Sequence, residues 1–386
     1  MSVYLDHAAT TPMVDVAIET LTLQLRKLGN PSSLHTPGRA VRKDIESARE
    51  VIANAVGSLA SEVIFTASGT EANNIALKGL YWRGKAAGRN LVVISAIEHH
   101  AILDPAQWLH DHEGAEVATI GVDNNGVINL AELADLITRR GDEIAVISIM
   151  AANNETGVVQ PIAEVVKLAQ ENSIPVHCDA VQSFGKVQFS FTDLQLTALS
   201  LSAHKIGGPL GIGLLILRRG LDMPALLHGG GQEREIRSGT LNAPSILAFA
   251  AAVTESIRTF EEQNTQMAQL RENFARGILE RIPDAYINGV LAERLPGIIN
   301  VTFPGTESDT LLLLLDARGI AASTGSACSA GVQRPSHVLL AMGHSDLTAR
   351  SSIRFSLGRT TTLGDIEKAL EVLPSVIERA RVANLR

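Results

Sequence analysis

Lys205 is the residue of this sequence whose setting points most directly to covalent chemistry. It closes an apolar run in the segment SLSAHKIGGPLGIG, and glycines rather than a charged helix follow it. A lysine that is removed from water loses proton affinity, becomes a nucleophile near neutral pH and can bind an aldehyde as a Schiff base. A single lysine more often lies in a solvated turn. The interpretation therefore depends on the residues near it in the sequence, which are Ser202, His204 and the upstream segment HCDAVQ.

Asp179 lies in that upstream segment, directly after the strand-like run Pro175–Cys178. A buried carboxylate at this place could pair with the protonated ring nitrogen of a pyridine cofactor that acts as an electron sink. The alternative is an N-cap on a helix that starts at Ala180. Cys178 lies inside the apolar run and is predicted to be an inert thiol of the core.

The segment SGTEANN, Ser68–Asn74, stands between a predicted strand and a predicted helix. Backbone N–H groups at a helix N-terminus bind phosphate, and Gly69 would let such an anion approach closely. The spacing of Ser68 and Glu71 also fits a capping box. The two interpretations are compatible.

Two further groups could contact a planar cofactor or a carboxylate. His99 and His100 follow the strand-like run Leu91–Ser95. An imidazole there could stack on a ring or carry protons near pH 7, although a lone histidine is more often structural. Arg354 lies among apolar residues in SSIRFSLGR. A half-buried arginine suits a bidentate contact with a carboxylate, and an internal ion pair is the alternative.

Cys328 lies at the centre of a loop of small residues, STGSACSAG at Ser323–Gly331. Such a loop packs poorly, so its thiol is predicted to be accessible. Accessibility together with a nearby positive group makes a reactive thiolate. An ordinary small-residue turn is the alternative.

The elements that must position these residues alternate between short β-branched runs and amphipathic stretches. Strand-like runs are Val63–Thr66, Leu91–Ser95, Val117–Ile120, Ile144–Met150, Pro175–Cys178, Ala198–Ser202 and Gly213–Leu217. Helix-like stretches are Arg39–Val56, Thr70–Trp82, Ala101–His110, Leu130–Thr138 and Pro161–Glu171. The alternation predicts βαβ units and a mainly parallel sheet, whose ligands bind outside the carboxyl ends of the strands.

The pattern changes after Asn242. A long, mostly helical stretch is predicted over Ala243–Arg281, then a strand over Ile298–Phe303, a leucine-rich helix near Asp309–Asp316, a strand over Ser352–Leu357 and a last helix from about Leu363. We place a domain boundary near Glu255–Glu262.

Composition and charge exclude several classes of protein. The 386 residues are 45% hydrophobic and 19% charged, which excludes a disordered chain. The longest aliphatic run, Leu311–Leu315, is far shorter than the roughly 20 residues of a membrane span, and the N-terminus lacks the features of a signal peptide. A net charge of −8 argues against nucleic-acid binding, and two cysteines do not indicate a disulfide framework. We expect a soluble protein of a reducing compartment.

Together the motifs resemble the class V aminotransferase group of pyridoxal-phosphate enzymes, and within it the cysteine desulfurases of the NifS/IscS-like type. The match runs in the family's order from DHAATTP at Asp6–Pro12 to SSIRFSLGR at Ser351–Arg359. The TGSAC form of the cysteine loop separates this type from relatives with a shorter loop. The resemblance implies an α/β fold of fold type I: a large domain with a mainly parallel mixed sheet flanked by helices (14–258), and a smaller α+β domain (1–13 and 259–386).

The resemblance also implies a role for each matching residue. Lys205 resembles the lysine that holds pyridoxal phosphate, His99 the ring-stacking acid and base, and Cys328 the nucleophile that forms a persulfide. Asn154 and Arg354 resemble the groups that hold the cofactor and the substrate carboxylate. The remaining cofactor contacts are Asp179 for the pyridine nitrogen, Gln182 for the phenolic oxygen, and Gly69, Thr70, Ser202, His204 and, from the other subunit, Thr240 for the phosphate.

The implied reaction takes sulfur from L-cysteine, leaves L-alanine and a persulfide on Cys328, and passes that sulfur to an acceptor such as an iron–sulfur scaffold protein. A cytoplasmic homodimer is implied, with no metal, no membrane and no direct nucleic-acid partner. A selenocysteine lyase or β-lyase is the first alternative, followed by a transaminase and by a non-catalytic protein of the same fold. Arg334 and Glu235 depart from the family's pattern, since an acidic residue and a glycine are usual there.

Overall fold

The computed structural model describes residues 2–188, 190–325 and 335–384. Its strands are β1 (Val3–Tyr4), β2 (Val63–Thr66), β3 (Leu91–Ser95), β4 (Glu116–Ile120), β5 (Ile144–Met150), β6 (Val176–Asp179), β7 (Ala198–Ser202), β8 (Gly213–Leu217), β9 (Tyr286–Ile287), β10 (Ile298–Thr302), β11 (Ile320–Ala321) and β12 (Ser352–Ser356). Its α-helices are α1 (Asp15–Gln24), α2 (Thr36–Val56), α3 (Gly69–Ala86), α4 (His100–Glu113), α5 (Leu130–Arg140), α6 (Ile162–Gln170), α7 (Ala243–Arg258), α8 (Phe260–Arg281), α9 (Ser308–Asp316), α10 (His337–Ala341), α11 (Asp346–Arg350) and α12 (Leu363–Asn384).

The sequence prediction did not include the short strands β1, β9 and β11 or the helices α1, α10 and α11, and three further details differ. The predicted strand Pro175–Cys178 is shifted by one residue, so Asp179 is the last residue of β6, and a turn rather than a helix follows at Ala180. The predicted helical stretch Ala243–Arg281 is two helices, because the backbone leaves helical geometry at Thr259 (φ −103°, ψ 7°) between α7 and α8. The backbone at the ends of an element therefore sets its bounds, which the apolar periodicity alone does not predict.

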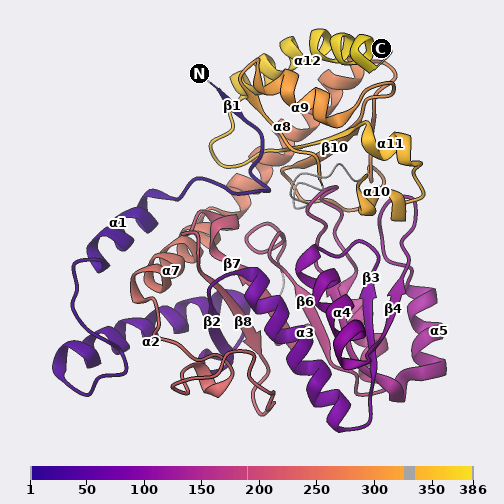
Figure 1. Cartoon of the computed structure of the whole chain (residues 1–386). Helices are drawn as coiled ribbons and strands as arrows, with labels where there is room; N and C mark the ends of the chain where they lie inside the picture. The colour runs from indigo at the N-terminus through magenta and orange to yellow at the C-terminus, as the bar shows by residue number, and fades with distance from the viewer. Residues whose placement is uncertain (1, 189, 326–334, 385–386) are drawn as a thin grey trace.

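The largest sheet has seven strands in the order β2-β8-β7-β6-β5-β3-β4. Neighbours pair in parallel from β7 to β4, whereas β8 pairs antiparallel with both β7 and β2. One hydrophobic cluster joins the sheet to α2, α5, α6 and α7, and another joins it to α3 and α4. Helices thus cover both faces of the sheet (Figure 1), as a continuously buried strand such as β5 requires. The predicted α/β fold with a mainly parallel mixed sheet is confirmed.

The C-terminal elements form a second core at one end of the molecule. Strands β12, β10 and β9 form an antiparallel sheet, and β1 pairs with β11. A separate hydrophobic cluster joins Val3 and Leu5 of the N-terminus to residues of α8, α9 and α12. Figure 1 shows β1 beside these C-terminal elements at the top of the molecule. We propose on this basis that residues 1–13 and 259–386 form the small domain and 14–258 the large one.

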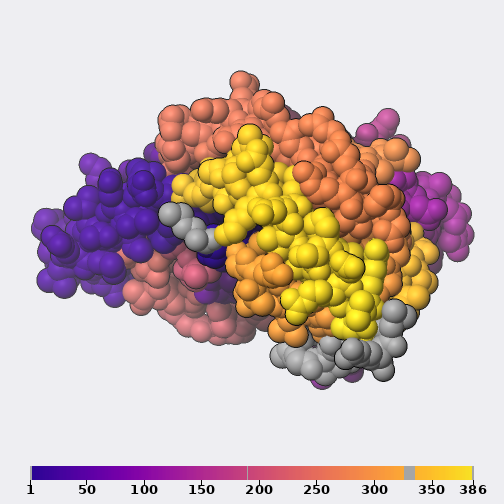
Figure 2. Space-filling model, turned by 90° about the horizontal axis from the view of Figure 1, so that it is seen from above, coloured from indigo at the N-terminus to yellow at the C-terminus, as the bar shows by residue number. Residues whose placement is uncertain are grey.

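The two N-terminal helices form an arm that projects from the side of the molecule. In the view from above, this indigo arm extends well beyond the yellow and orange C-terminal elements (Figure 2). The segment that joins α1 to α2 exposes large apolar side chains: Leu25 is 68% exposed, Leu28 88% and Leu34 84%. Within the described residues, no helix is both long enough and apolar enough to cross a bilayer.

Candidate active site

A cavity of about 430 Å³ lies where three parallel strands end. Met150, Asp179 and Ser202 are the last residues of β5, β6 and β7, and all three line it. This is where ligands bind in open parallel sheets. Ten of the residues predicted from the sequence line the cavity: Gly69, Thr70, His99, Asn154, Asp179, Gln182, Ser202, His204, Lys205 and Arg354.

The N-terminus of α3 provides one wall of the cavity. Ser68 caps the helix, because its hydroxyl accepts the backbone N–H of Glu71 at 3.1 Å. The predicted capping box forms only in part, since the Glu71 carboxylate accepts the backbone N–H of Ala67 rather than that of Ser68. Gly69 has no room for a side chain: a Cβ there would lie 2.8 Å from Cγ2 of Val181. Gly69 and Thr70 of the first helical turn line the cavity, as the anion-binding interpretation requires.

Asp179 is fixed from two sides. Its Oδ2 accepts a hydrogen bond from Nδ2 of Asn73 at 2.6 Å, and its Oδ1 accepts the backbone N–H of Val181 at 3.0 Å. The sequence analysis missed Asn73. A signal existed, because Asn73 is four residues after Gly69 and so lies on the same face of α3. Asp179 is thus a buried, oriented carboxylate rather than the cap of a helix.

Lys205 lies in the short turn Ala203–Ile206 that follows β7. Its Nζ donates to the carbonyl oxygens of Ala8 at 2.5 Å and Ala9 at 2.9 Å. The Ala8 carbonyl also accepts Nε2 of Gln182 at 2.8 Å, while Oε1 of Gln182 is buried with no partner among the described residues. Ala8 and Ala9 belong to the DHAATTP segment, which entered the sequence analysis only as a family motif. This segment thus supplies two hydrogen-bond acceptors to Lys205.

His99 is held as a neutral imidazole. Its Nδ1 accepts the backbone N–H of Ala101 at 3.0 Å, which places the ring proton on Nε2. Burial lowers its pKa, with the Asp179 carboxylate acting in the opposite direction. An imidazole in this state donates one proton and carries no charge near pH 7.

Glu98, adjacent to His99, was also missed by the sequence analysis. Its Oε1 accepts the backbone N–H of Met150 at 2.9 Å, and its Oε2 is buried without a partner in the described part of the chain. Burial raises the pKa of this carboxyl well above its ordinary value, and the nearby charge of Asp179 adds to the shift. Asp179 lines the cavity, whereas Glu98 lies outside its lining.

Arg354 fits both interpretations made from the sequence. Its Nη2 donates to Oδ1 of Asp6 at 2.7 Å, which is the internal ion pair, and its Nη1 donates to the carbonyl of Asn154 at 3.0 Å. Its Nε is buried and has no partner in the described residues. The guanidinium lines the cavity, so it can still receive a carboxylate.

Two predicted site residues remain, and only one of them, Thr240, can be placed relative to this cavity. Thr240 is exposed and does not line the cavity of its own chain. Its segment is fixed by Arg237, whose Nε donates to Oε1 of Glu71 at 2.8 Å, and by the buried pair of Glu233 with Arg49 at 2.7 Å. Cys328 lies outside the described residues, and Gly325, which lines the cavity, is the last described residue before it.

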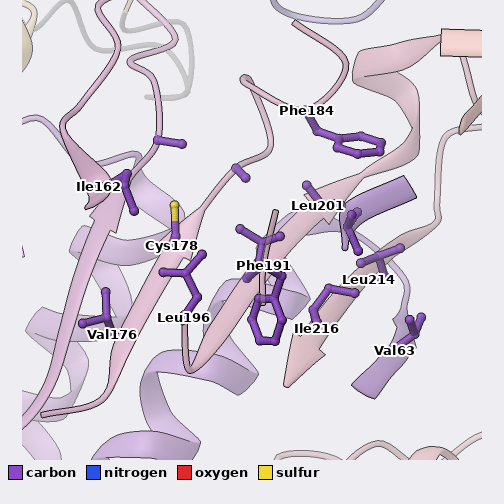
Figure 3. Close-up of a cluster of buried hydrophobic side chains, with 14 of the residues drawn as sticks. Val63, Ile162, Val176, Cys178, Phe184, Phe191, Leu196, Leu201, Leu214 and Ile216 are labelled. Atoms are coloured by element: carbon purple, nitrogen blue, oxygen red, sulfur yellow. The ribbon is translucent and has the colours of Figure 1, made fainter. Parts of the chain in front are cut away.

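Cys178 is buried, as predicted. It lies in the hydrophobic cluster with Ile162, Val176 and Leu196 (Figure 3). Side chains alternate along a strand, so Asp179, the next residue of β6, lies on the opposite face. Burial raises the pKa of its thiol well above the ordinary value, with smaller contributions from Asp179 and Glu98. A thiol in this state is protonated and unreactive.

The fold and the cavity define a class of enzyme. The family model of the class-V aminotransferases matches residues 3–369, and the chain belongs to this family. Within the family it belongs with the IscS- and NifS-like cysteine desulfurases. It is 47% identical to an IscS-like cysteine desulfurase of Mycobacterium tuberculosis over 99% of this chain and 98% of that protein.

Two further comparisons agree with this placement. The chain is 42% identical to the cysteine desulfurase IscS of Dictyoglomus turgidum, over 98% of this chain and 95% of that protein. It also superposes on the solved structure of a NifS-like protein with a TM-score of 0.91 and 35% identity, covering 98% of this chain and all of the other. The resemblance inferred from the motifs is confirmed.

Proposed function

We propose that this enzyme is a pyridoxal-phosphate-dependent cysteine desulfurase. The net reaction joins L-cysteine and the thiol of Cys328 to give L-alanine and a persulfide on Cys328. The observation that carries the proposal is the convergence of Lys205, Asp179 and Arg354 on one cavity that Gly325 of the cysteine loop also lines. A lysine nucleophile, a carboxylate for a ring nitrogen and a guanidinium for a carboxylate are the groups that this reaction needs.

The residues present fit pyridoxal phosphate. Oε1 of Gln182 is buried and has no partner among residues 2–188, 190–325 and 335–384, as expected of an amide that could bind the cofactor. Gly69 and Thr70 at the first turn of α3 line the cavity together with Ser202 and His204, and a helix N-terminus in this position suits a phosphate. When bound, this cofactor supplies an electron sink for negative charge at the substrate Cα.

The side chains of the cavity divide the remaining tasks. Lys205 would hold the cofactor and, once released, its Nζ would take the proton from the substrate Cα. Asp179, oriented by Asn73, would keep a proton on the ring nitrogen. Arg354 and Asn154 would hold the substrate carboxylate, and His99 would stack on the ring with a proton on Nε2.

His204 would contribute to the phosphate contacts as an uncharged donor. Burial lowers its pKa to about 4, with Lys205 and then Lys186 acting in the same direction. Its Nδ1 lies 3.2 Å from the hydroxyl of Thr10. A neutral imidazole holds an anion by a hydrogen bond of fixed direction rather than by charge.

The site is proposed to be completed in a homodimer, with Thr240 reaching the phosphate of the other subunit. Thr240 is exposed and does not line the cavity of its own chain, which supports this proposal. The exposed leucines of the segment between α1 and α2 also support it, because they offer an apolar surface to a second subunit. Mixing Lys205→Ala with Thr240→Ala tests it. In a hybrid dimer one site then carries both defects and the other none, so activity returns in part. If Thr240 served its own subunit, both hybrid sites would be defective and no activity would return.

The persulfide is proposed to pass to an acceptor protein for iron–sulfur assembly or another sulfur-containing product in the cytoplasm. Acceptors that form mixed disulfides with Cys328 would be trapped by pull-down. The Cys328→Ala variant is the control. If it recovered the same disulfide-linked proteins as the wild-type enzyme, this route would be contradicted.

The deciding experiment for the desulfurase is turnover of L-cysteine without any keto acid. Wild-type enzyme should release alanine and carry sulfur on Cys328, as mapped by mass spectrometry after one turnover. Cys328→Ala should still bind the cofactor but release no alanine from L-cysteine. The matched variant Cys178→Ala should keep the wild-type rate and lose only about 1 kcal/mol of unfolding free energy. Sulfur on Cys178, or an active Cys328→Ala enzyme, would refute the assignment, and a need for keto acid would indicate a transaminase.

A further inference from the structure

The side chain of Glu155 contacts the chain on both sides of Cys328. Its Oε2 accepts the hydroxyl of Ser336 at 2.5 Å. The same oxygen lies against Gly325, since a Cβ at that position would be 2.0 Å from it. Residues 326–334, which lie between these two contacts, are outside the described part of the chain. One buried carboxylate thus joins the chain before the cysteine to the chain after it.

The turn that carries Glu155 is held by Asn153. Oδ1 of this buried side chain accepts the backbone N–H of Glu155 at 2.9 Å and that of Thr156 at 3.0 Å. Its Nδ2 donates to the carbonyl of Ile97 at 3.0 Å. Asn154 lines the main cavity, whereas Glu155 lies outside its lining. The backbone turn that places Asn154 at the cavity therefore also places Glu155 beside the ends of the cysteine-bearing chain.

Each of these ends is also fixed by a regular element. Ser323 exchanges backbone hydrogen bonds with Arg354 of β12, with N···O distances of 3.1 and 2.7 Å. Ser336 is the N-cap of α10, where its hydroxyl accepts the backbone N–H of Leu339 at 3.2 Å. The Ser336 hydroxyl thus accepts within α10 and donates to Glu155. The carboxylate consequently ties the end next to β12 to the end next to α10.

The places of the two ends limit where the thiol of Cys328 can lie. This cysteine follows Gly325 by three positions and precedes Ser336 by eight. Because a chain reaches at most about 3.6 Å per residue, its thiol cannot lie far from the cavity that Gly325 lines. A reactant that is kept within reach of its target reacts faster, because less freedom is lost in the reaction.

We propose that Glu155 is a positioning residue, which holds Gly325 and Ser336 together and so keeps the Cys328 thiol within reach of the substrate sulfur. The inference rests on the proposed function, in which this thiol receives the sulfur of L-cysteine. Glu155 acts through the two ends of the chain and has no part in holding the cofactor or in moving the proton at the substrate Cα. Its loss should slow sulfur transfer and spare the steps that precede it.

The test compares two rates of the full-length holoenzyme. The first is the appearance of sulfur on Cys328 after mixing with L-cysteine, followed by rapid quenching and mass spectrometry. The second is the exchange of the Cα proton of L-alanine in deuterated water, followed by NMR, which needs Lys205 but no thiol. Glu155→Ala should lower the first rate about tenfold or more and leave the second within about twofold. Glu155→Gln keeps the size and an oxygen acceptor, so it should stay within about threefold of wild type in both rates.

A matched pair of helix caps separates this contact from helix capping. Ser345 caps α11 by accepting the backbone N–H of Thr348 at 3.2 Å, as Ser336 caps α10. Glycine replaces a serine cap at little cost, so Ser336→Gly removes chiefly the donor to Glu155. Ser336→Gly should slow sulfur transfer, whereas Ser345→Gly should not. If Glu155→Ala does not fold, this comparison decides.

Three results would overturn the proposal: a wild-type rate of sulfur transfer in Glu155→Ala, equal losses of both rates in it, or an equal defect in Glu155→Gln. Wild-type enzyme that exchanges the alanine proton but places no sulfur on Cys328 would instead refute the proposed function. Alkylation of Cys328 by iodoacetamide then still tests the contact, because it needs no sulfur transfer. It should be faster in Glu155→Ala than in wild type, and equal rates would count against a role of Glu155 in holding the ends.

Discussion

Arg354 and Asp6, 348 positions apart in the chain, form a buried ion pair with 2.7 Å between Nη2 and Oδ1. Only 5% of the arginine side chain and 20% of the aspartate side chain is exposed. The guanidinium that is proposed to hold the substrate carboxylate is therefore already oriented, and partly neutralised, before any substrate arrives. Orientation in advance lowers the cost of binding.

This pair leads to a prediction on substrate binding. Arg354→Gln should raise KM for L-cysteine tenfold or more, because a charge-assisted hydrogen bond contributes about 1.5–3 kcal/mol. Asp6→Asn should instead lower KM, since a neutral amide keeps the shape but no longer offsets the guanidinium charge. Steady-state kinetics with cofactor absorbance as a control for site integrity would check both. A higher KM in Asp6→Asn would show that orientation outweighs charge.

Asn73 is predicted to support the cofactor through Asp179. Loss of its 2.6 Å hydrogen bond in Asn73→Ala should weaken pyridoxal phosphate binding by about tenfold or more, as for other hydrogen bonds to charged groups. Equilibrium dialysis would measure the dissociation constant. The neighbouring Asn74→Ala removes a side chain whose Nδ2 donates to the carbonyl of Thr70, and it should bind the cofactor normally. Equal affinities in the two variants would contradict the role of Asn73.

Acid sensitivity should follow from histidines that are buried in the neutral form. His177 lies between the hydroxyls of Ser148 at 2.8 Å and Ser200 at 2.9 Å, and burial lowers its pKa to about 3. The unfolded chain, with a histidine pKa near 6.5, therefore binds more protons than the folded protein. Stability is thus retained above pH 6.5 and falls as the pH drops toward the folded-state value, by about 1.4 kcal/mol per pH unit for each such group.

Urea unfolding of the apoprotein at several pH values would measure this slope. His177→Gln should show a shallower decline below pH 6.5, because it lacks the titrating group, whatever its absolute stability. His112→Gln, at an exposed position, should keep the wild-type slope. Identical slopes in all three proteins would exclude His177 as a source of acid sensitivity.

Glu235 is predicted to be a site where glycine stabilises the protein. It is the third of three consecutive non-glycine residues with positive φ, at 44°, 60° and 60° for Glu233, Arg234 and Glu235. A residue with a side chain pays about 1–2 kcal/mol to adopt this backbone conformation. Glycine avoids that cost but loses more conformational freedom on folding, which offsets part of the gain. Glu235→Gly should therefore raise the unfolding free energy by about 0.5–1 kcal/mol, whereas Glu235→Ala should not. Equal stabilities of these variants would argue against strain.

Much of the fold follows from local sequence. The runs Val63–Thr66 and Ile144–Met150 coincide with β2 and β5, because continuous apolar, β-branched segments are stable only in a buried strand. Motif residues at strand ends, such as Asp179 and Lys205, could be placed at one edge of the sheet because parallel strands share that edge. The break between α7 and α8 at Thr259 falls inside the region Glu255–Glu262 where the sequence predicts a domain boundary, although the helical stretch predicted over Ala243–Arg281 does not show it.

The sequence by itself determined the strands of the large sheet, the residues at or just after their ends and the family motifs, because each is encoded within a few neighbouring positions. The tertiary structure alone decided the partners: Asp6 for Arg354, Asn73 for Asp179, and Ala8 as the shared acceptor of Gln182 and Lys205. These partners lie more than 100 positions apart in the chain. Contacts of this kind depend on how the N-terminal segment and the two cores close on one another, which no local spacing specifies.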